Sequence, residues 1–372
     1  MPSVEAKRTD ATQVVDCRGN SFRIDSAAFC RNVARARRLS RTGVRVYHVV
    51  KGGGYGLGVE RAVQLGLAAD VDGFCVGTPE EALLALGCAQ GRPVILFTSC
   101  LPAEFARIAR PGLIVTVNTM AALHAVQSIA GQTYLLELDC GFGRFGLDYA
   151  ALRDVIARGL GPECLGAYTH FGSRSFDQLQ TGLERFDAML ATLRAHVGDE
   201  IMTMAAASHA MIWRPSLSYT AVDPGSLLYG LLPDDLAPDF EAVVPRVAAS
   251  LLQINVIEGP QKLSIGYDSE IELRAGGRTG VFGLGWRDGL PTKAMGAVLV
   301  GGTRVPVIGR TLLHTIVDLS DAPANASLGD EVVLVGCQGD EAIELAEAAA
   351  IMGITATQFH FQVLGAIAVP QN

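Results

Sequence analysis

From about residue 44, short apolar runs alternate with amphipathic segments over roughly 200 residues. Each run has the length of a buried strand, and the segments between runs have the spacing of helices with one apolar face. The runs cover residues 44–50, 73–77, 93–98, 113–118, 134–139, 164–171 and 201–208. This repeat predicts parallel strands joined by helices, most economically an α/β fold with a closed (β/α)8 TIM-type barrel. A doubly wound open sheet is the alternative, but the G-x-G-x-x-G expected after its first strand is missing.

The pattern changes near Pro245. Segments such as RVAASLLQINVIE, AVLVGGTRVPVIG and EVVLVG are rich in β-forming residues and are separated by turns. One helical segment, IELAEAAAIM (343–352), interrupts them before FHFQVLGAIAVP (359–370). We therefore expect a barrel domain over residues 1–245, whose first residues are candidates for pairing with the second domain. The second domain, over residues 246–372, is expected to be mostly antiparallel β.

Composition narrows the class of partner. The chain has 372 residues, a formal net charge of −8 and no dense basic block, which argues against a nucleic-acid partner. Its eight cysteines are scattered without a C-x-x-C pair, as is typical of small buried side chains in a reducing compartment. The N-terminus lacks the apolar core of a signal peptide, and no apolar run reaches membrane-spanning length. These features predict a cytoplasmic protein without membrane contact or a metal site.

The sequence VVKGGGYGLG (49–58) points most directly to chemistry, because Lys51 directly follows a predicted strand and precedes a glycine-rich loop. The carboxyl ends of barrel strands are where catalytic groups gather. Partial burial at such a position lowers the pKa of a lysine amine and frees it to form an imine. A lysine beside a flexible surface turn is the other interpretation of the same pattern.

Four further motifs accompany the Lys51 loop: LELDCGFGRFGLD (136–148), THF (169–171), the segment 206–230 that contains AVDPGSLLYG, and SIGYDSEIEL (264–273). Together they make the whole chain resemble the alanine racemase family of fold-type III pyridoxal-phosphate (PLP) enzymes. The resemblance implies a barrel plus a β domain, a homodimer, an amino-acid substrate, and PLP bound covalently to Lys51.

The resemblance also assigns the other site residues. Arg144 matches the arginine that meets the cofactor's ring oxygen and the substrate carboxylate, a role that suits its planar fork. Glu137 stands where a carbamylated lysine often supports that arginine. Tyr267 matches the second catalytic base, which reaches the partner subunit's cofactor. The cofactor-binding set implied in addition comprises Tyr55, His170, Ser208, Gly225 and Ser226.

Several positions depart from the family pattern. Asp223 occupies the position where racemases of the family usually carry Arg, and an acid there would stabilise a protonated pyridine ring. Fold-type III decarboxylases are similar at this point. The other departures, most of them at substrate-binding positions, are Leu57 for His, Trp286 for an entrance Tyr, Leu313 and His314 for a Met-Asp pair, and Val369 or a deletion for a C-terminal Tyr.

These features predict a PLP-dependent amino-acid racemase, which is an isomerase. Its substrate is alanine or another amino acid. Lys51 and Tyr267 would act on opposite faces of Cα, with Asp223 pairing with the cofactor ring and linked through His170 to Tyr267. The alternative is a PLP-dependent fold-type III lyase, a decarboxylase or aldolase-type enzyme that uses the protonated ring. A non-catalytic PLP-binding protein is a third hypothesis, against which the complete β domain argues.

Overall fold

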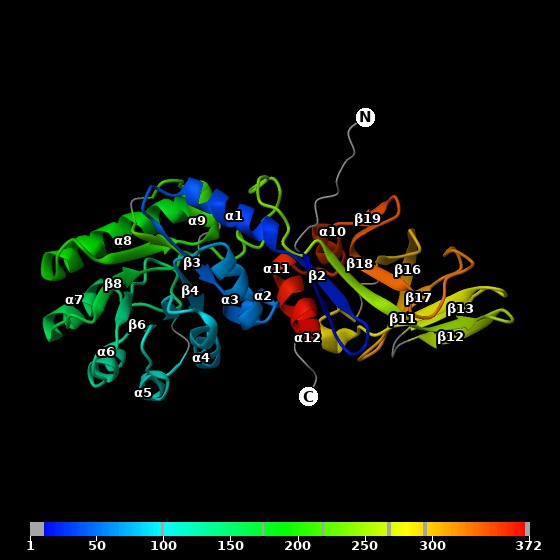
Figure 1. The fold of residues 1–372 in the computed structure, drawn as a ribbon, viewed down its shortest axis with the longest axis horizontal. Coiled ribbons are helices and arrows are strands. Elements are labelled where there is room, and N and C mark those ends of the chain that lie inside the picture. Colours follow the sequence, from blue (N-terminus) through cyan, green and yellow to red (C-terminus); the bar gives the residue numbers. More distant parts are fainter. Residues whose placement is uncertain are drawn as a thin grey trace. The chain divides into compact units, whose positions relative to one another are not determined.

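The computed structural model describes residues 11–97, 100–172, 175–217, 219–265, 269–292 and 296–368. The chain forms two compact units. The first comprises residues 1–28, 55–58 and 242–372, and the second comprises residues 29–54 and 59–241. Figure 1 shows the strands β11 to β19 of the first unit in yellow to orange, and the blue to green strands and helices of the second.

The second unit is a closed barrel of eight parallel strands in the order β10-β3-β4-β5-β6-β7-β8-β9. The strands are β3 Arg45–Val49, β4 Gly73–Val76, β5 Val94–Leu96, β6 Leu113–Val117, β7 Tyr134–Glu137, β8 Cys164–Tyr168, β9 Met202–Ala206 and β10 Ala221–Val222. The seven predicted strands are confirmed, and the short β10 closes the ring between β9 and β3. The predicted barrel is therefore confirmed, and the open sheet is wrong.

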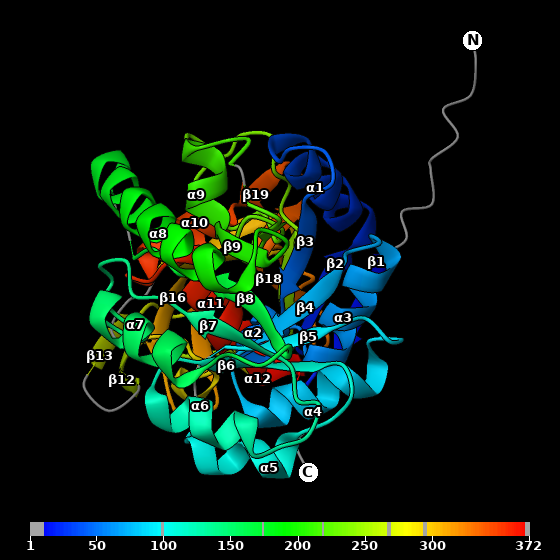
Figure 2. The same ribbon diagram turned by 90° about the vertical axis from the view of Figure 1, so that its left-hand side faces the viewer.

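Helices surround these strands, as Figure 2 shows for α4, α6, α7 and α8. The helices that accompany the barrel strands are α1 Ser26–Leu39, α3 Val59–Ala68, α4 Pro79–Cys88, α5 Phe105–Ile108, α6 Met120–Gln127, α7 Tyr149–Arg158, α8 Phe176–Val197 and α9 Ser208–Trp213, with a left-handed turn α2 at Lys51–Tyr55 and a 3₁₀ turn η1 at Pro102–Glu104. Every residue of β4, β5, β6, β7 and β9 is buried. Burial on both faces explains why these strands are continuous apolar runs without alternation.

The first unit is built on a nine-stranded sheet in the order β1-β2-β11-β14-β17-β16-β15-β18-β19, and each of its described pairings is antiparallel. Its strands are β1 Ala11–Val15, β2 Ser21–Asp25, β11 Arg246–Val256, β14 Arg278–Phe282, β15 Ala297–Val300, β16 Thr303–Arg310, β17 Thr315–Asp318, β18 Glu331–Gln338 and β19 Glu341–Ile343. A separate hairpin joins β12 Gln261–Ile265 to β13 Ser269–Leu273. The N-terminal strand β2 pairs with β11, so the start of the chain belongs to this sheet. The predicted antiparallel β architecture is confirmed.

The C-terminal segment corrects the sequence analysis, which grouped FHFQVLGAIAVP with the β-rich segments. Residues 356–368 are helical, as is the preceding α10 Leu345–Ile351. The segment consists of α11 Ala356–Phe359, a π-helical turn η3 at His360–Leu364, and α12 Gly365–Ala368. Thr355 and Gln358 form a capping box at its start. This local helix signal outweighs the apolar run, which cannot by itself distinguish a strand from a buried helix.

Among the described residues, no single helix is long and apolar enough to cross a membrane; α10 with residues 356–368 meets that criterion only as a pair bent by 89°. In the same parts of the chain, no group of three or more His, Cys, Asp or Glu side chains is placed to hold a metal ion. All eight cysteines carry free thiols.

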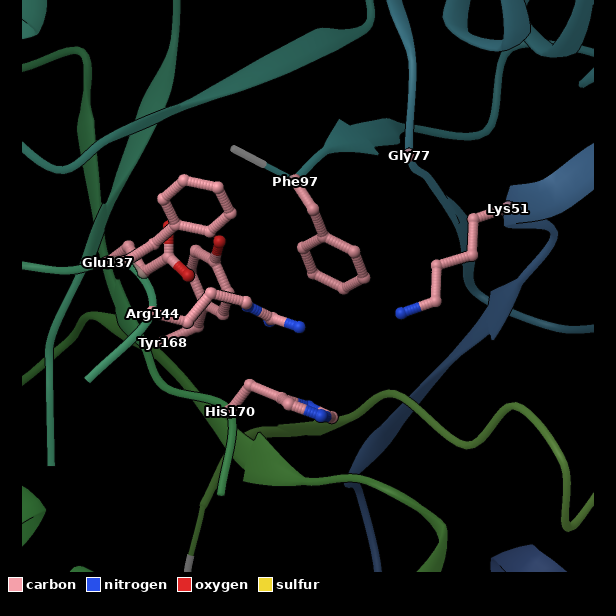
Figure 3. A pocket seen from close by; sticks show the side chains of 8 residues that line it. Lys51, Gly77, Phe97, Glu137, Arg144, Tyr168 and His170 are labelled. Atoms are coloured by element: carbon pink, nitrogen blue, oxygen red, sulfur yellow. The ribbon is translucent and has the colours of Figure 1, made fainter. Parts of the chain in front are cut away.

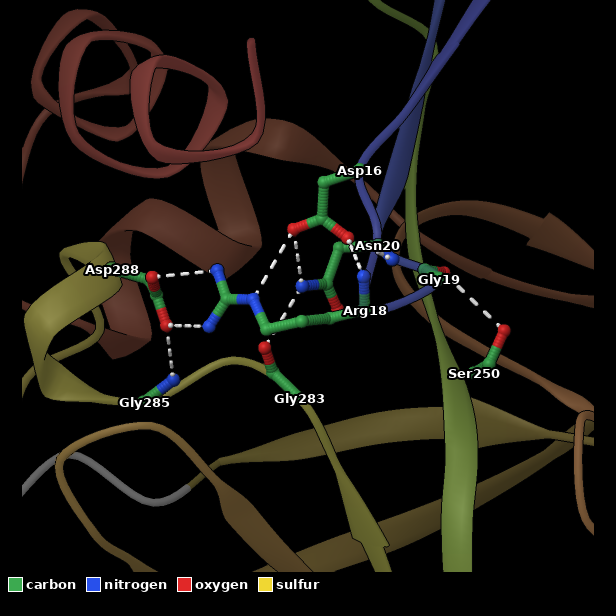
Figure 4. Close-up of polar contacts among 8 residues, drawn as sticks. All are labelled: Asp16, Arg18, Gly19, Asn20, Ser250, Gly283, Gly285 and Asp288. Carbon is green, nitrogen blue, oxygen red and sulfur yellow. Dashed lines mark hydrogen bonds and ion pairs between the residues drawn. The ribbon is translucent and has the colours of Figure 1, made fainter. Parts of the chain in front are cut away.

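A buried ion-pair network in the first unit joins the turn between β1 and β2 to the 3₁₀ turn η2 at Trp286–Asp288 (Figure 4). The Arg18 guanidinium donates two hydrogen bonds to the Asp288 carboxylate, at 3.0 and 2.8 Å, and its Nε donates to Asp16 at 3.3 Å. Asp288 is almost fully buried and also accepts the N–H of Gly285 at 2.9 Å. Because the Asp288 charge lies away from water, it depends on Arg18 for compensation.

Arg18→Met is expected to lower the free energy of unfolding of this unit by about 3 kcal/mol, because the buried Asp288 charge then loses its partner. Urea denaturation followed by Trp286 fluorescence measures the loss. Replacing Trp213, the other tryptophan of the chain, by Phe removes its signal.

Arg304→Met is the matched control for this prediction. Arg304 also contacts two carboxylates, those of Glu341 and Glu347, but at an exposed site. Exposed ion pairs contribute little to stability, so a much smaller loss is expected. Equal losses in the two variants would show that burial of the Asp288 charge does not set the effect.

Candidate active site

A cavity of about 180 Å³ opens at the carboxyl ends of the barrel strands (Figure 3). Its lining residues are Lys51, Gly77, Phe97, Glu137, Arg144, Phe145, Tyr168 and His170. Six of them lie at the end of a strand or within two residues after it, so β3, β4, β5, β7 and β8 all contribute to one space. This end of a barrel is the one at which active sites are built.

Lys51 leaves the end of β3 in an unusual turn. Gly52, Gly53 and Gly54 all have left-handed backbone conformations, with φ of 66°, 63° and 65°. Glycine adopts this conformation without the steric cost that other residues have, which accounts for the run GGG. The Lys51 amine lies 5.7 Å from the centre of the Phe97 ring and has no hydrogen-bond or ionic partner among the residues that the structure describes. Its amine therefore projects into the cavity.

Burial lowers the pKa of Lys51, and the Asp223 charge opposes this effect while the Arg144 charge adds to it. A lowered pKa increases the fraction of unprotonated amine at neutral pH. The amine is then available both as a nucleophile toward an aldehyde and as a base.

Arg144 lies in a loop that returns the chain to the end of β7. The Asp139 carboxylate accepts the N–H groups of Gly141, Phe142 and Gly143 at 2.9, 3.0 and 3.1 Å, which fixes the curve of the loop. The Arg144 guanidinium stacks on the rings of Phe142 and Phe145, 4.6 and 5.6 Å from their centres. No hydrogen bond from Arg144 to a described residue is formed. Its donors therefore remain available to a ligand.

The charges of the cavity favour an anion. Figure 3 shows the Lys51 amine and the Arg144 guanidinium pointing toward one another, with Phe97 on one side and His170 on the other. Burial, and then the charges of Lys51 and Arg144, lower the pKa of His170 to about 4. His170 is therefore neutral at pH 7. Two cations facing one space suit a ligand with a carboxylate or phosphate group.

Asp223 directly follows β10 and is only 4% exposed. Its Oδ1 atom has no hydrogen-bond partner within the described parts of the chain. Burial raises the pKa of Asp223 to about 7, although the charge of Lys51 opposes the rise. A buried carboxyl oxygen without a partner is costly, and a ligand that carries a proton donor would satisfy it. The pyridine nitrogen of PLP is such a group when protonated.

The predicted phosphate-binding residues of the barrel also lie together. Ser208 begins α9 after β9, and its hydroxyl oxygen accepts the N–H groups of Gly225 and Leu227 at 3.2 and 3.1 Å. Gly225 and Ser226 follow Asp223 at the end of β10. The Gly225 N–H is engaged by Ser208, so the Ser208 hydroxyl proton and the Ser226 N–H are the donors that a phosphate dianion would use at these adjoining strand ends. Together with Lys51 and Asp223, this donor set fits PLP.

The remaining predicted positions belong to the other unit by residue number. Tyr55 is buried with a left-handed φ of 55°, and its ring packs 4.8 Å from that of Phe361; its neighbour Leu57 is also buried. Trp286 is 42% exposed in η2. Leu313 and His314 lie in the turn between β16 and β17. Tyr267 and Val369 lie outside the described residues.

Sequence reasoning missed Phe97 and Tyr168 as residues of the cavity. Their rings are 5.3 Å apart and form one of its walls. Both lie within apolar runs that predict strands, so their sequence context does not distinguish them from core residues. Their position at the carboxyl ends of strands was the available signal.

Comparison with known proteins identifies the family. A model of the alanine racemase N-terminal domain matches residues 24–233, and a model of the alanine racemase C-terminal domain matches residues 244–366. Alanine racemase of Stutzerimonas stutzeri (strain A1501) is 31% identical over 308 residues, which cover 79% of this chain and 84% of that protein. Alanine racemase of Deinococcus radiodurans is 31% identical over 329 residues, which cover 85% and 89%.

Solved structures agree. The biosynthetic alanine racemase from Pseudomonas aeruginosa is 27% identical with a TM-score of 0.76, covering 95% of this chain and 96% of that one. The alanine racemase from E. faecalis shares the fold, with a TM-score of 0.83 at 23% identity, covering 96% of this chain and 99% of that one. The predicted resemblance is confirmed: the chain belongs to the alanine racemase family of PLP-dependent racemases.

Proposed function

We propose that the protein interconverts the L and D forms of an amino acid and that Lys51 is the residue that binds PLP. The observation that carries the proposal is the buried Lys51 amine, which faces Arg144 across a cavity at the carboxyl ends of the barrel strands. PLP, when bound, supplies an electron sink that makes the Cα proton of an amino acid removable. The similarity to alanine racemases makes alanine, or an amino acid close to it in size, the first substrate to test.

The residues of the barrel have distinct proposed roles. Arg144 binds and orients the substrate carboxylate, and its stacking on two rings holds it in place. The Nζ atom of Lys51 removes or returns the proton on one face of Cα. Ser208, Gly225 and Ser226 bind the phosphate group, and Asp223 faces the ring nitrogen. His170 is a neutral neighbour of both cations, and its proposed role is to hold the cofactor in position.

Racemisation needs a base on each face of Cα, and one side chain cannot serve both. We assign the second base to Tyr267 of the partner subunit in a homodimer. Phe142 and Phe145, beside the mouth of the cavity, are 41% and 42% exposed, and a partner subunit that covers them would remove apolar surface from water. We further assign Tyr55 to the phosphate, and Trp286, Leu313 and His314 to the substrate entrance. The free thiols support a reducing compartment, the cytoplasm, as the place of action.

The lyase alternative is not favoured. Asp223 is the residue that suggested it, but the family models match both halves of the chain and the relatives are alanine racemases. An acid near the ring nitrogen is compatible with racemisation when the substrate carboxylate is held by Arg144.

Proton NMR in D2O, with the PLP-loaded protein and a panel of L- and D-amino acids, tests the proposed function. We expect the Cα proton signal to disappear and chiral analysis to show the opposite enantiomer. The amino acid that reacts fastest identifies the substrate. Exchange without inversion, or formation of CO2, an aldehyde or a keto acid, would contradict racemisation, and so would the absence of any exchange.

A further inference from the structure

Glu81 makes more contacts than its place in α4 requires. It is the third residue of the helix, and it forms a capping box with Thr78. Its Oε2 atom accepts the N–H groups of Thr78 at 3.2 Å and Gly77 at 2.8 Å, while Oε1 accepts the N–H of Gly53 at 2.8 Å. The side chain is buried, with 8% exposure. A capping box accounts for the contact with Thr78 alone.

The two additional contacts lie on either side of Lys51. Gly53 is the middle residue of the left-handed turn that follows Lys51, and a hydrogen bond from Gly54 N–H to Val50 closes that turn at 2.9 Å. Gly77 lies against the Lys51 side chain, since a Cβ atom built on Gly77 would be 3.1 Å from Lys51 Cβ. One carboxylate therefore fixes the backbone after Lys51 and the backbone beside its stem.

We propose that Glu81 is a positioning residue for Lys51, whose carboxylate holds the Gly53 turn and Gly77 together so that the amine points into the cavity. The proposal rests on the proposed function only in taking Lys51 as the reacting amine. It requires a group with two acceptor oxygens, because three N–H donors converge on it. A carboxylate satisfies this requirement and a carboxamide does not, since one of its two ends is a donor.

Glu81→Gln separates this role from helix capping. Gln serves as well as Glu at the third position of a capping box, so a residue needed only for the cap would tolerate the change. At the position of the carboxylate, however, the Gln NH2 group would face the N–H of Gly53 or of Gly77, and two donors cannot form a hydrogen bond. We expect kcat to fall about 10- to 100-fold with little change in KM, because a displaced amine loses its alignment with Cα.

Two neighbouring variants are the controls. Thr78→Ala removes the hydrogen bond from the Glu81 N–H to the Thr78 hydroxyl, at 3.2 Å, but leaves the carboxylate contacts in place. Glu80→Gln makes the same chemical change at the adjacent exposed position. Both are expected to keep kcat within about twofold of the wild type. A loss in Thr78→Ala equal to that in Glu81→Gln would assign the effect to the helix cap and overturn the proposal.

Hydrogen–deuterium exchange of the PLP-loaded protein provides a readout that does not depend on turnover. We expect faster exchange in Glu81→Gln for peptides that contain Gly53 and Gly77, and unchanged exchange at Gly53 in Thr78→Ala. Wild-type exchange at Gly53 together with wild-type kcat in Glu81→Gln would overturn the proposal. If the wild type racemises no amino acid, the proposed function is wrong. The hydrogen–deuterium exchange data still decide whether Glu81 holds Gly53 and Gly77 together. If Glu81→Gln does not fold, Glu81→Asp keeps both oxygens but shortens their reach, and the same two readouts apply.

Discussion

Lys51→Ala is expected to abolish covalent PLP binding and to lower kcat/KM at least about 10³-fold, because it removes both the attachment point and one of the two bases. The chain has four lysines, Lys7, Lys51, Lys262 and Lys293. Borohydride reduction of the PLP-loaded protein followed by peptide mass spectrometry therefore shows directly which of them carries the cofactor. The absorbance of bound cofactor and the rate of racemisation complete the measurement.

Lys262→Ala is the matched control, because this exposed lysine pairs only loosely with Glu272, at 3.6 Å. It should leave labelling and rate unchanged. Cofactor fixed to a lysine other than Lys51, or a rate in Lys51→Ala within tenfold of the wild type, would contradict the assignment.

Mixing subunits extends this prediction to the proposed dimer. Lys51→Ala and Tyr267→Phe should each be nearly inactive alone. If each site combines Lys51 of one subunit with Tyr267 of the other, a mixed dimer has one intact site and activity should return on mixing, to at most about a quarter of the wild-type value. No recovery after demonstrated subunit exchange would show that Tyr267 acts within its own subunit or not at all.

The barrel could be predicted from sequence because its strands are buried on both faces. Continuous apolar runs mark such strands, and seven of the eight were found in this way. The eighth, Ala221–Val222, has two residues and gives no pattern of its own. It is a strand because its backbone pairs with β9 on one side and with β3 on the other, which closes the barrel. The helical end of the chain at residues 356–368 shows the converse, since an apolar run alone does not fix the type of element.

From sequence, a site residue could be predicted where its position at the end of a strand indicated its chemical role. Lys51, at the end of a strand before glycines, could be recognised from its local sequence, whereas the roles given to Arg144 and Asp223 depended on the family motifs. Glu81 illustrates what local sequence does not contain. Its capping box follows from the spacing of Thr78 and Glu81, but its contact with Gly53 exists because β3 and β4 are neighbours in the barrel.

Asp223→Asn is expected to lower the rate of racemisation about 100-fold, because the carboxylate favours a proton on the ring nitrogen and the loss of one such electrostatic contribution typically costs about that much. Asn cannot provide the negative charge that favours a proton on the ring nitrogen. The pH dependence of the cofactor's visible absorbance should therefore also change. A variant with the wild-type rate, absorbance and pH dependence would show that Asp223 does not face the cofactor ring.

The cofactor-free protein gives an independent test of the Asp223 environment. Burial raises its pKa from 3.8 to about 7, so between these pH values the folded state binds a proton that the unfolded state releases. The contribution of Asp223 to stability is therefore fully present below about pH 4 and is lost as the pH rises to about 7. The loss has an upper bound of about 4 kcal/mol, since one pKa unit corresponds to about 1.4 kcal/mol. At each pH, the free energy of unfolding in urea is measured for the wild type and for Asp223→Asn. The difference between the two values isolates this contribution. If this difference in free energy does not change with pH, the carboxyl group is solvated in the folded protein. Its Oδ1 atom could then no longer be assigned to a cofactor.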